Sequence, residues 1–519
     1  MNSHKNNKRI AKNTLMLYFR MIFTMLVSLY TSRVVLNMLG IEDFGIYNVV
    51  GGAVIMFGFL SGAMSSATQR FLTYDIGQKN HVQLRKTFNA AQIIHIGIAI
   101  LIILLAETIG LWFVSNKLNL PGVRLEAALW VYHCSVLSFI VTVIQAPYSA
   151  LIIAHEKMSV FAYLSIVEVL LKLLVVLLLM YISFDKLELY ALLILGVSVT
   201  VAVFYRIYSR IQFNETRFLI VNDKVLYKRL ASYSVWNLFG SVSLIAKTQG
   251  VSIMLNIFFG VVVNSALAVA NQVSGTVYSF VSNFQVASNP QIIKSYATDD
   301  KEYMNNLMIR TSKFSFILLF ILTLPVIMEI EYILQLWLKL VPEYTVIFTK
   351  LILVEALIHS ISGSMMAAVS ASGKIRLYHS VVGGFSLLIL PTSYFLFMIG
   401  YPAKTTFIVS IIFASLALIF RLIFTKKLIP EFTIGKFLQE VLVRNFLIII
   451  LSLIIPMMLI SNMNPGLTRL SLVVLTSFGI SIITSYCIGM KNNEKLFVKN
   501  ALTSVRKNIY KYIANYRKK

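Results

Sequence analysis

Three cationic residues lie within segments that contain no acidic residue, and their chemistry suits the binding of a solute. Arg20 and Arg33 fall in residues 12–41, which contain no acidic residue, and Lys247 falls in a second such stretch, residues 224–298. An ionised side chain in mid-bilayer costs roughly 2.5–3.5 kcal/mol on insertion scales, so it faces the protein interior, a partner or water. Cations without neighbouring carboxylates favour an anionic ligand, such as a phosphate.

Uncharged polar residues accompany these cations on the same predicted helices. Amide and hydroxyl groups suit a hydroxyl-rich ligand, so we select four candidate ligands for a glycan: Ser65, Gln69, Asn271 and Asn283. The alternative for any hydroxyl is a bond to its own helix, four residues back. Arg20 and Arg33 lie close enough to helix ends to reach an interface instead. Lys247 is too deep to do so easily.

Two pairs of ionisable residues are spaced so that each shares one helix face. Glu168 and Lys172 are four residues apart, which predicts a structural ion pair. Glu355 and His359 have the same spacing, and a buried carboxyl beside a histidine could take up and release a coupling proton. A packed, protonated Glu355 is the alternative.

The elements that carry these residues are long apolar blocks. Of the 519 residues, 58% are hydrophobic and only 13% charged, which excludes an ordinary soluble domain. Blocks of about 20 uncharged residues match the hydrocarbon thickness of a bilayer. We predict an all-α polytopic membrane protein with fourteen helices: 12–38, 44–68, 87–114, 125–152, 158–182, 188–208, 231–258, 264–292, 309–330, 346–371, 376–399, 405–425, 444–462 and 468–490.

The basic residues fall on one side of this predicted topology. With the N-terminus in the cytoplasm, 35 of the 46 Lys and Arg residues lie on that side, seven lie on the other and four lie inside helices. The positive-inside rule therefore places both termini in the cytoplasm. The same rule explains the net charge of +25 without nucleic acid as a partner. The basic C-terminal tail is expected to lie on anionic lipid headgroups.

The two halves of the chain resemble each other at an offset of about 220 residues. Four matches occur in the same order: Leu36–Gly40 with Leu255–Gly260, Glu107 and Trp112 with Glu331 and Trp337, Pro121 with Pro342, and Ala154–Lys157 with Ala371–Lys374. Six helices per repeat give two bundles of the same orientation, with substrate bound between them. We predict a V-shaped transporter with these parts: an N-terminal bundle at 1–210, a cytoplasmic linker at 211–230, a second bundle at 231–428, two additional helices at 429–490 and a basic tail at 491–519.

No motif indicates an enzyme, a metal site or a cofactor. The sequence contains no P-loop, no metal-ligand spacing and no nucleophile elbow. Cys134 and Cys487 both lie in apolar blocks and form no spacing motif. Without an ATP site, the energy for transport must come from an ion gradient or from the substrate gradient itself.

Several segments resemble the polysaccharide flippases of the Wzx type. The likeness is carried by residues 11–14 (AKNT), 32–47 (SRVVLNMLGIEDFGIY), 67–72 (ATQRFL), 147–150 (PYSA) and 154–158 (AHEKM). These flippases belong to the multidrug/oligosaccharidyl-lipid/polysaccharide (MOP) exporter superfamily, which also contains the MATE drug exporters. The likeness is most specific in residues 11–160.

This resemblance implies a flippase of the bacterial inner membrane. It would move a polyprenyl-diphosphate-linked oligosaccharide, a precursor of polysaccharide or O-antigen, from the cytoplasmic to the periplasmic leaflet. Arg20, Arg33 and Lys247 lie on helices whose cations engage the diphosphate in related flippases. Membrane lipids, a polysaccharide polymerase and glycosyltransferases are the expected partners of a monomeric protein. The alternatives are a cation-coupled MATE-type drug exporter, which usually keeps an acidic residue in its cavity, and a membrane scaffold for glycosyltransferases.

Overall fold

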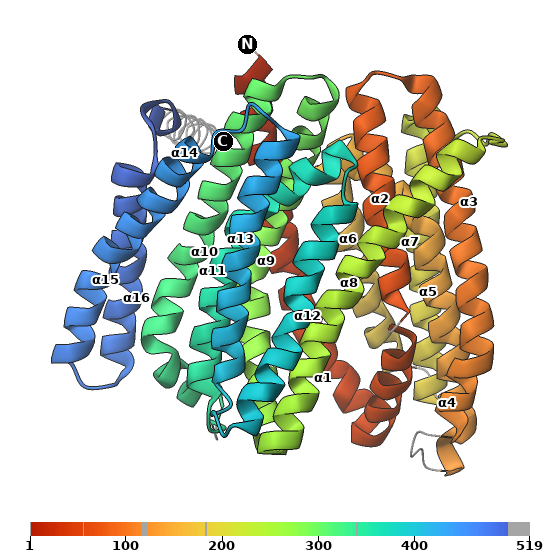
Figure 1. Ribbon diagram of the computed structural model, residues 1–519. Helices are drawn as coiled ribbons and strands as arrows, with labels where there is room; N and C mark the ends of the chain where they lie inside the picture. The colour runs from red at the N-terminus through yellow and green to blue at the C-terminus, as the bar shows by residue number, and fades with distance from the viewer. Residues whose placement is uncertain (1, 56, 117–121, 182–183, 339–340, 497–519) are drawn as a thin grey trace, which may run out of the picture. The chain divides into compact units, whose positions relative to one another are not determined.

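The protein is described by a computed structural model that covers residues 2–55, 57–116, 122–181, 184–338 and 341–496. Within these ranges the side chains of some residues, Arg33 among them, lie outside the description. Among the described residues, helices make up almost all of the structure (Figure 1). This confirms the predicted all-α architecture.

Fourteen long helices lie in the described part of the chain, together with short α-, 3₁₀- and π-helical segments. In order, the α-helices are α1 (Asn2–Ile55), α2 (Gly58–Gly77), α3 (His81–Leu105), α4 (Leu111–Asn116), α5 (Leu125–Ala154), α6 (Met158–Leu178), α7 (Lys186–Gln212), α8 (Lys224–Phe259), α9 (Val261–Ala297), α10 (Lys301–Trp337), α11 (Thr345–Ser372), α12 (Arg376–Met398), α13 (Thr405–Leu428), α14 (Ile434–Phe437), α15 (Arg444–Asn462) and α16 (Leu467–Thr484).

Twelve helical segments of the described chain are long and apolar enough to cross a membrane, which identifies a multi-pass membrane protein. Helices α2 and α9 are long enough but do not reach the same hydropathy, because polar residues interrupt them. They carry the four residues selected above as glycan ligands. A spanning helix of this polarity has to face protein or water rather than lipid tails.

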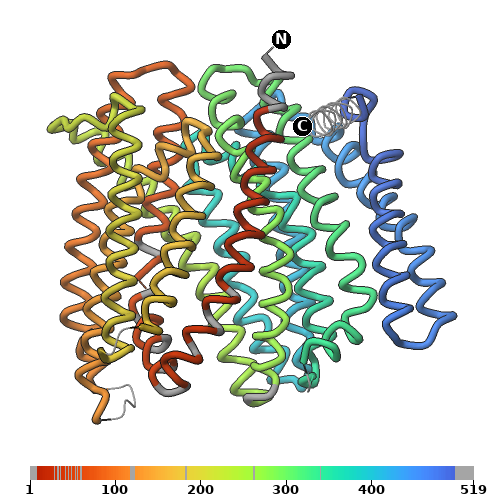
Figure 2. The backbone as a smooth tube through the Cα atoms, turned by 180° about the vertical axis from the view of Figure 1, so that it is seen from behind, coloured from red at the N-terminus to blue at the C-terminus, as the bar shows by residue number. Residues whose placement is uncertain are grey.

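The boundary between the first two helices differs from the prediction, because residues 44–68 do not form one continuous helix. Helix α1 runs on to Ile55 after a sharp bend at Gly40, whose φ of 78° is unfavourable for residues with a side chain. A new helix, α2, begins at Gly58 and ends at Gly77. Gly51, Gly52 and Gly58 surround this break, and glycine is a poor helix former. Figure 2 shows α1 in red, followed by the turn of the chain.

Backbone geometry repeats along the chain at the offset predicted from the sequence. Left-handed φ angles occur at Gly40 and again at Gly260, and they occur at Lys79 and again at Asp299, with one offset common to both pairs. The turn after α2 and the turn after α9 use the same three backbone hydrogen bonds and the same side-chain cap, each shifted by that offset. Two sequence halves that share turn geometry at this level are structural repeats. Pro121, one residue of the predicted match, lies outside the described residues.

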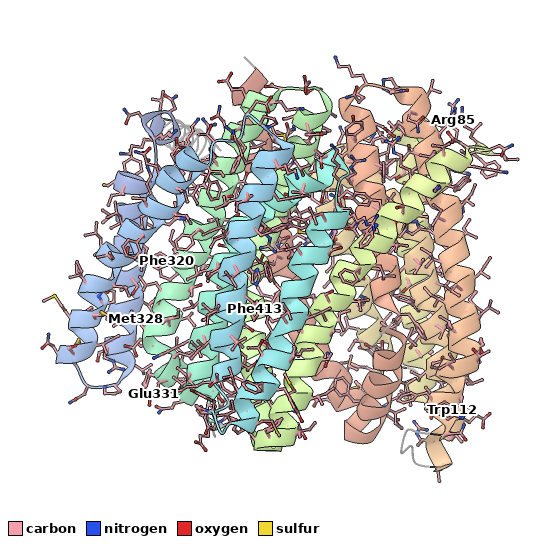
Figure 3. The ribbon with its side chains drawn as sticks, viewed as in Figure 1. Arg85, Trp112, Phe320, Met328, Glu331 and Phe413 are labelled. Atoms are coloured by element: carbon pink, nitrogen blue, oxygen red, sulfur yellow. The ribbon has the colours of Figure 1, made fainter. Side chains whose placement is uncertain are left out.

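The chain forms two compact units, and helices α8 to α12 each contribute to both. One unit comprises 1–250, 282–307 and 364–391, and the other comprises 251–281, 308–363 and 392–519. These units differ from the predicted bundles at 1–210 and 231–428, whose boundaries stay a prediction. In the first unit, Arg85 and Trp112 lie at opposite ends of the rod formed by α3 and α4 (Figure 3). Trp112 is exposed, as an interface anchor should be.

Candidate functional site

Two of the residues predicted to bind substrate, Arg20 and Asn283, are in direct contact in the first unit. Arg20 on α1 donates a hydrogen bond of 3.0 Å from Nη2 to the Asn283 side-chain oxygen on α9. The guanidinium lies 4.9 Å from the centre of the Phe161 ring on α6. Its Nε is buried and has no hydrogen-bond partner among the described residues. A buried donor of this kind is costly unless something accepts its hydrogen bond.

The other residues predicted to bind substrate are spread over several helices. Lys247 is partly buried in the second half of α8, and Ser65 and Gln69 are partly buried on α2. Asn271 is exposed on the part of α9 that belongs to the second unit. The side chain of Arg33 lies outside the described residues. Binding of substrate by all of these residues stays a prediction.

The two pairs predicted from i, i+4 spacing both form. Lys172 Nζ donates to Glu168 Oε1 at 2.6 Å on α6, with both side chains partly exposed. On α11, His359 Nε2 lies 3.2 Å from Glu355 Oε1, and Glu355 is buried. The contact in each pair is confirmed, whereas a role in proton coupling stays a prediction.

A site that the sequence did not predict surrounds the buried carboxylate of Glu156, between α5 and α6. Its Oε1 accepts a hydrogen bond of 2.5 Å from Lys294 Nζ, and its Oε2 accepts one of 2.5 Å from Gln291 Nε2. Arg9 Nε on α1 lies 2.8 Å from Oε2. Helices from both repeats, α1 and α9, therefore converge on one acidic residue.

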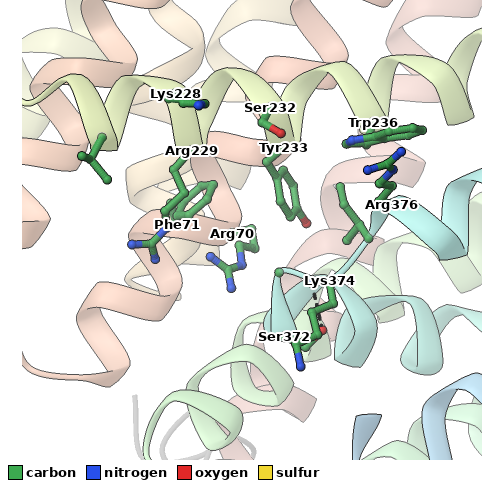
Figure 4. A pocket seen from close by; sticks show the side chains of 13 residues that line it. Arg70, Phe71, Lys228, Arg229, Ser232, Tyr233, Trp236, Ser372, Lys374 and Arg376 are labelled. Atoms are coloured by element: carbon green, nitrogen blue, oxygen red, sulfur yellow. Dashed lines mark hydrogen bonds between the residues drawn. The ribbon is translucent and has the colours of Figure 1, made fainter. Parts of the chain in front are cut away.

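A second unpredicted site is a basic pocket of about 590 Å³ in the same unit (Figure 4). It lies between the second half of α2, the first half of α8 and the loop between α11 and α12. Five cationic side chains line it: Arg70, Lys228, Arg229, Lys374 and Arg376. Phe71, Tyr233 and Trp236 supply aromatic walls, and none of the lining residues, all of which the structure describes, is acidic.

Arg70 holds the floor of this basic pocket in place. Its Nε donates a hydrogen bond of 2.8 Å to the carbonyl of Ser370, and its Nη2 donates to the carbonyl of Ala371. These carbonyls end helix α11, where a cation is favoured by the helix dipole. The guanidinium also lies 4.5 Å from the centre of the Phe71 ring. Arg229 and Lys374, by contrast, are exposed.

The sequence contained weak signals for both unpredicted sites. Arg70 and Glu156 lie in two of the segments that carry the family likeness, 67–72 and 154–158, and Glu156 and Lys374 lie in the matched pair of loops. From the sequence, the cations among these residues indicated only which side of the membrane each loop occupies. Contacts between segments far apart in the chain, from Glu156 to Lys294 or from Arg70 to Ser370, have no signature in local spacing.

Comparison with known proteins gives the family and the fold. Residues 10–296 match the family model described as "Polysaccharide biosynthesis protein". No curated protein matches the chain. Among solved structures, an outward-facing multidrug resistance MATE transporter of the MOP superfamily matches 82% of this chain and 97% of its own, with 12% identity and a TM-score of 0.70.

Two other solved structures are similar to a comparable degree. A MOP superfamily transporter from Pyrococcus furiosus has 12% identity and a TM-score of 0.69, and covers 82% of this chain and 96% of its own. The MATE transporter ClbM in complex with Rb⁺ has 13% identity and a TM-score of 0.66, over 79% and 94% of the two chains. The chain therefore has the MATE-like fold of the MOP superfamily, and it belongs to the polysaccharide biosynthesis protein family.

Proposed function

We propose that this protein is a flippase that moves a polyprenyl-diphosphate-linked oligosaccharide from the cytoplasmic to the periplasmic leaflet by alternating access. The contact between Arg20 and Asn283 carries the proposal. It joins a cation with an unpaired, buried Nε to an amide, and the two groups come from helices of different repeats. A cation suits a phosphate, and an amide suits a sugar hydroxyl.

The charge pattern of the helices supports a phosphate-bearing cargo over a cationic drug. Residues 12–41 and 224–298 contain cations but no acidic residue. The Pyrococcus furiosus transporter is described as having a binding pocket of reverse polarity that suggests a different function. A diphosphate without a counter-charge cannot cross hydrocarbon at a useful rate, because removing its charge from water is prohibitive. Arg20 and Lys247 would compensate that charge, while the polyprenyl tail stays in lipid.

The test is complementation of a bacterial strain blocked in translocation of a lipid-linked glycan, with defined sugar donors. Lys247→Ala and Arg20→Gln should each abolish polymer export while the amount of protein in the membrane stays normal. Lys12→Gln is the matched control, because Lys12 is an exposed cation on the same helix as Arg20. Normal export by both the Lys247 and the Arg20 variants would overturn the proposal.

A cation-coupled exporter of the MATE type is the second candidate, and one observation favours it. Glu355 is buried next to His359, at 3.2 Å, so the pair has the composition of a proton-binding site. This candidate predicts that overexpression raises drug resistance and that Glu355→Gln removes the effect. The flippase proposal predicts no resistance in either strain.

A further inference from the structure

The basic pocket and the Glu156 site are the same structural site in the two repeats. The Glu156 site is built from α1, the α5–α6 loop and α9. The basic pocket is built from α8, the α11–α12 loop and α2, which are the counterparts of those three elements in the other repeat. Arg9 in the first site corresponds to Arg229 in the second, at the offset that relates Gly40 to Gly260.

The two sites share the Arg9/Arg229 position but differ in their acidic residue. They also differ in the other two groups that bind it, because Lys294 and Gln291 correspond to Tyr74 and Phe71 at that offset. Glu156 corresponds to Gly373 in the matched loops, and both have a left-handed backbone, with φ of 59° and 75°. A residue with a side chain adopts this conformation at some cost. Glu156 nevertheless adopts it, and the Glu156 carboxylate neutralises the charges of Lys294 and Arg9. At Gly373 there is no carboxylate, and the exposed Arg229 and Lys374 line the pocket around it. Asp75 on α2 interacts electrostatically with Arg70 and Arg229, but it is not among the lining residues.

We propose that the basic pocket binds the phosphate group of a membrane lipid, which takes the place of the missing carboxylate. Arg229 and Lys374 line the pocket with exposed side chains, and Arg70 lies at its floor (Figure 4). Helix α12 begins at Arg376, directly beyond the loop, and the N-terminus of a helix adds a partial positive charge and free N–H groups. Cations of this density in one concave site suit phosphate or diphosphate oxygens.

The position of the basic pocket favours a lipid as the carrier of that phosphate. Lys228 and Arg229 directly precede the span predicted at 231–258, on the side predicted to be cytoplasmic, so they lie at headgroup level. The Arg376 guanidinium lies 5.3 Å from a ring centroid of Trp236, one wall of the pocket. Two lipids carry the required group at this level: the polyprenyl diphosphate of the cargo and an anionic phospholipid.

Fluorescence of Trp236 gives a test that does not depend on transport. The chain has four tryptophans, and replacing Trp112, Trp130 and Trp337 with phenylalanine leaves Trp236 as the single reporter. This parent protein, purified at full length and checked for cooperative thermal unfolding, is titrated with inorganic pyrophosphate. We expect a saturable change in Trp236 emission, because a ligand on Arg376 alters its stacking on the indole.

Three variants of the parent decide the result. Gly373→Glu supplies the internal carboxylate and should abolish the response, whereas Gly373→Ala, which has the same backbone strain, should retain it. A Cβ at position 373 would lie 3.2 Å from Arg70 Nη2, so a small adjustment of that side chain is needed in both. Arg229→Gln with Lys374→Gln should weaken the apparent affinity by about tenfold or more. As a control, Arg206→Gln with Arg210→Gln removes the same charge from the exposed face of α7 and should change little.

Measurements in phosphatidylcholine nanodiscs distinguish the two lipids that could supply the phosphate. Addition of a polyprenyl diphosphate, but not of phosphatidylglycerol, should change Trp236 emission if the pocket receives cargo, and both should do so if it binds anionic phospholipid headgroups. The proposal is overturned if both lipids leave the emission unchanged, or if Gly373→Glu responds to pyrophosphate as the parent does. Normal export by the Lys247 and Arg20 variants would overturn the flippase proposal but would leave this binding result intact.

Discussion

The Nζ of Lys294 lies 2.5 Å from Oε1 of Glu156, and neither group has open access to solvent: the two side chains are 18% and 0% exposed. Because Arg9 and Gln291 bind the other carboxylate oxygen, the hydrogen-bonding capacity of this buried charge is well used. The Glu156 site is therefore a buried ionic contact that joins α1 and α9, helices of the two repeats.

Removing the carboxylate should destabilise the protein strongly. Glu156→Gln leaves Lys294 and Arg9 without a counter-charge, and breaking a buried pair in this way costs about 3–5 kcal/mol. The matched variant is Lys294→Gln, and the double variant should lose much less than the sum of the two single losses. Thermal unfolding of the four proteins in nanodiscs measures this. Additive losses would show that the two residues do not stabilise each other.

The Arg70 contacts with the end of α11 predict a specific requirement for arginine. Arg70 donates from two different nitrogens to two successive carbonyls, those of Ser370 and Ala371. The lysine ammonium of Arg70→Lys keeps the charge but cannot reproduce this planar geometry. We expect a loss of about 1–3 kcal/mol and faster proteolysis at the loop around Gly373. Arg85→Lys is the control, since Arg85 binds backbone carbonyls at an exposed position. Equal losses in the two variants would contradict the prediction.

A buried lysine in the second unit predicts that the segment after α16 is part of the fold. Lys313 on α10 is fully buried, and its Nζ donates to Glu494 Oε2 at 2.6 Å. Arg310 Nε lies 3.6 Å from the other carboxylate oxygen. Glu494→Gln should lower stability by about 3–5 kcal/mol, because it leaves Lys313 buried without its counter-charge.

The control for this prediction removes both charges. Lys313→Met combined with Glu494→Gln should recover most of the loss, since the uncompensated ammonium is then absent. Hydrogen exchange of the backbone around 490–496 should rise in the single variant and return toward the wild-type rate in the double variant. Unchanged exchange in Glu494→Gln would show that this segment is held by other contacts.

Local sequence patterns were sufficient to predict the helices and the contacts within them. Apolar blocks of bilayer length indicated the long helices, and four-residue spacing indicated the Glu168–Lys172 and Glu355–His359 contacts. The repeat was also predictable, because the matched loops kept the residues that end their helices. These features depend on neighbours in sequence, so they can be recognised from one chain.

The parts that could not be predicted depend on packing between distant segments. Glu156 and Arg70 bind groups in Lys294 and Ser370, and nothing in their local sequence specifies those partners. The break between α1 and α2 was missed because glycines are tolerated in membrane helices, so Gly51, Gly52 and Gly58 did not by themselves indicate an end. The contrast between Glu156 and Gly373 acquires meaning only after the two loops are seen in equivalent surroundings.

The contacts of Arg124 predict an acid-sensitive part of the stability on the side predicted to be periplasmic. Arg124 Nη1 donates to Asp185 Oδ2 at 2.5 Å, and Arg124 Nε donates to Asp43 Oδ1 at 2.9 Å. The hydrogen bond from Arg124 lowers the pKa of Asp185 below its ordinary value of 3.8, against a smaller opposing effect of burial. A lowered pKa in the folded state stabilises the fold above the unfolded-state pKa, and the effect disappears as the pH falls through the folded-state value.

The difference in melting temperature between the wild type and Arg124→Gln should therefore be constant from pH 7 to about pH 5 and shrink below about pH 4. Asp185→Asn should show the same loss at neutral pH, and its melting temperature should likewise approach that of the wild type in acid. Asp185 also accepts hydrogen bonds from the first N–H groups of α7. An asparagine side chain can replace those hydrogen bonds in part. Lys186→Gln, a neighbouring change of one charge, should leave the pH profile of the wild type unaltered. A difference that stays constant down to about pH 3 would place the stabilising effect of Arg124 in its packing rather than in its charge.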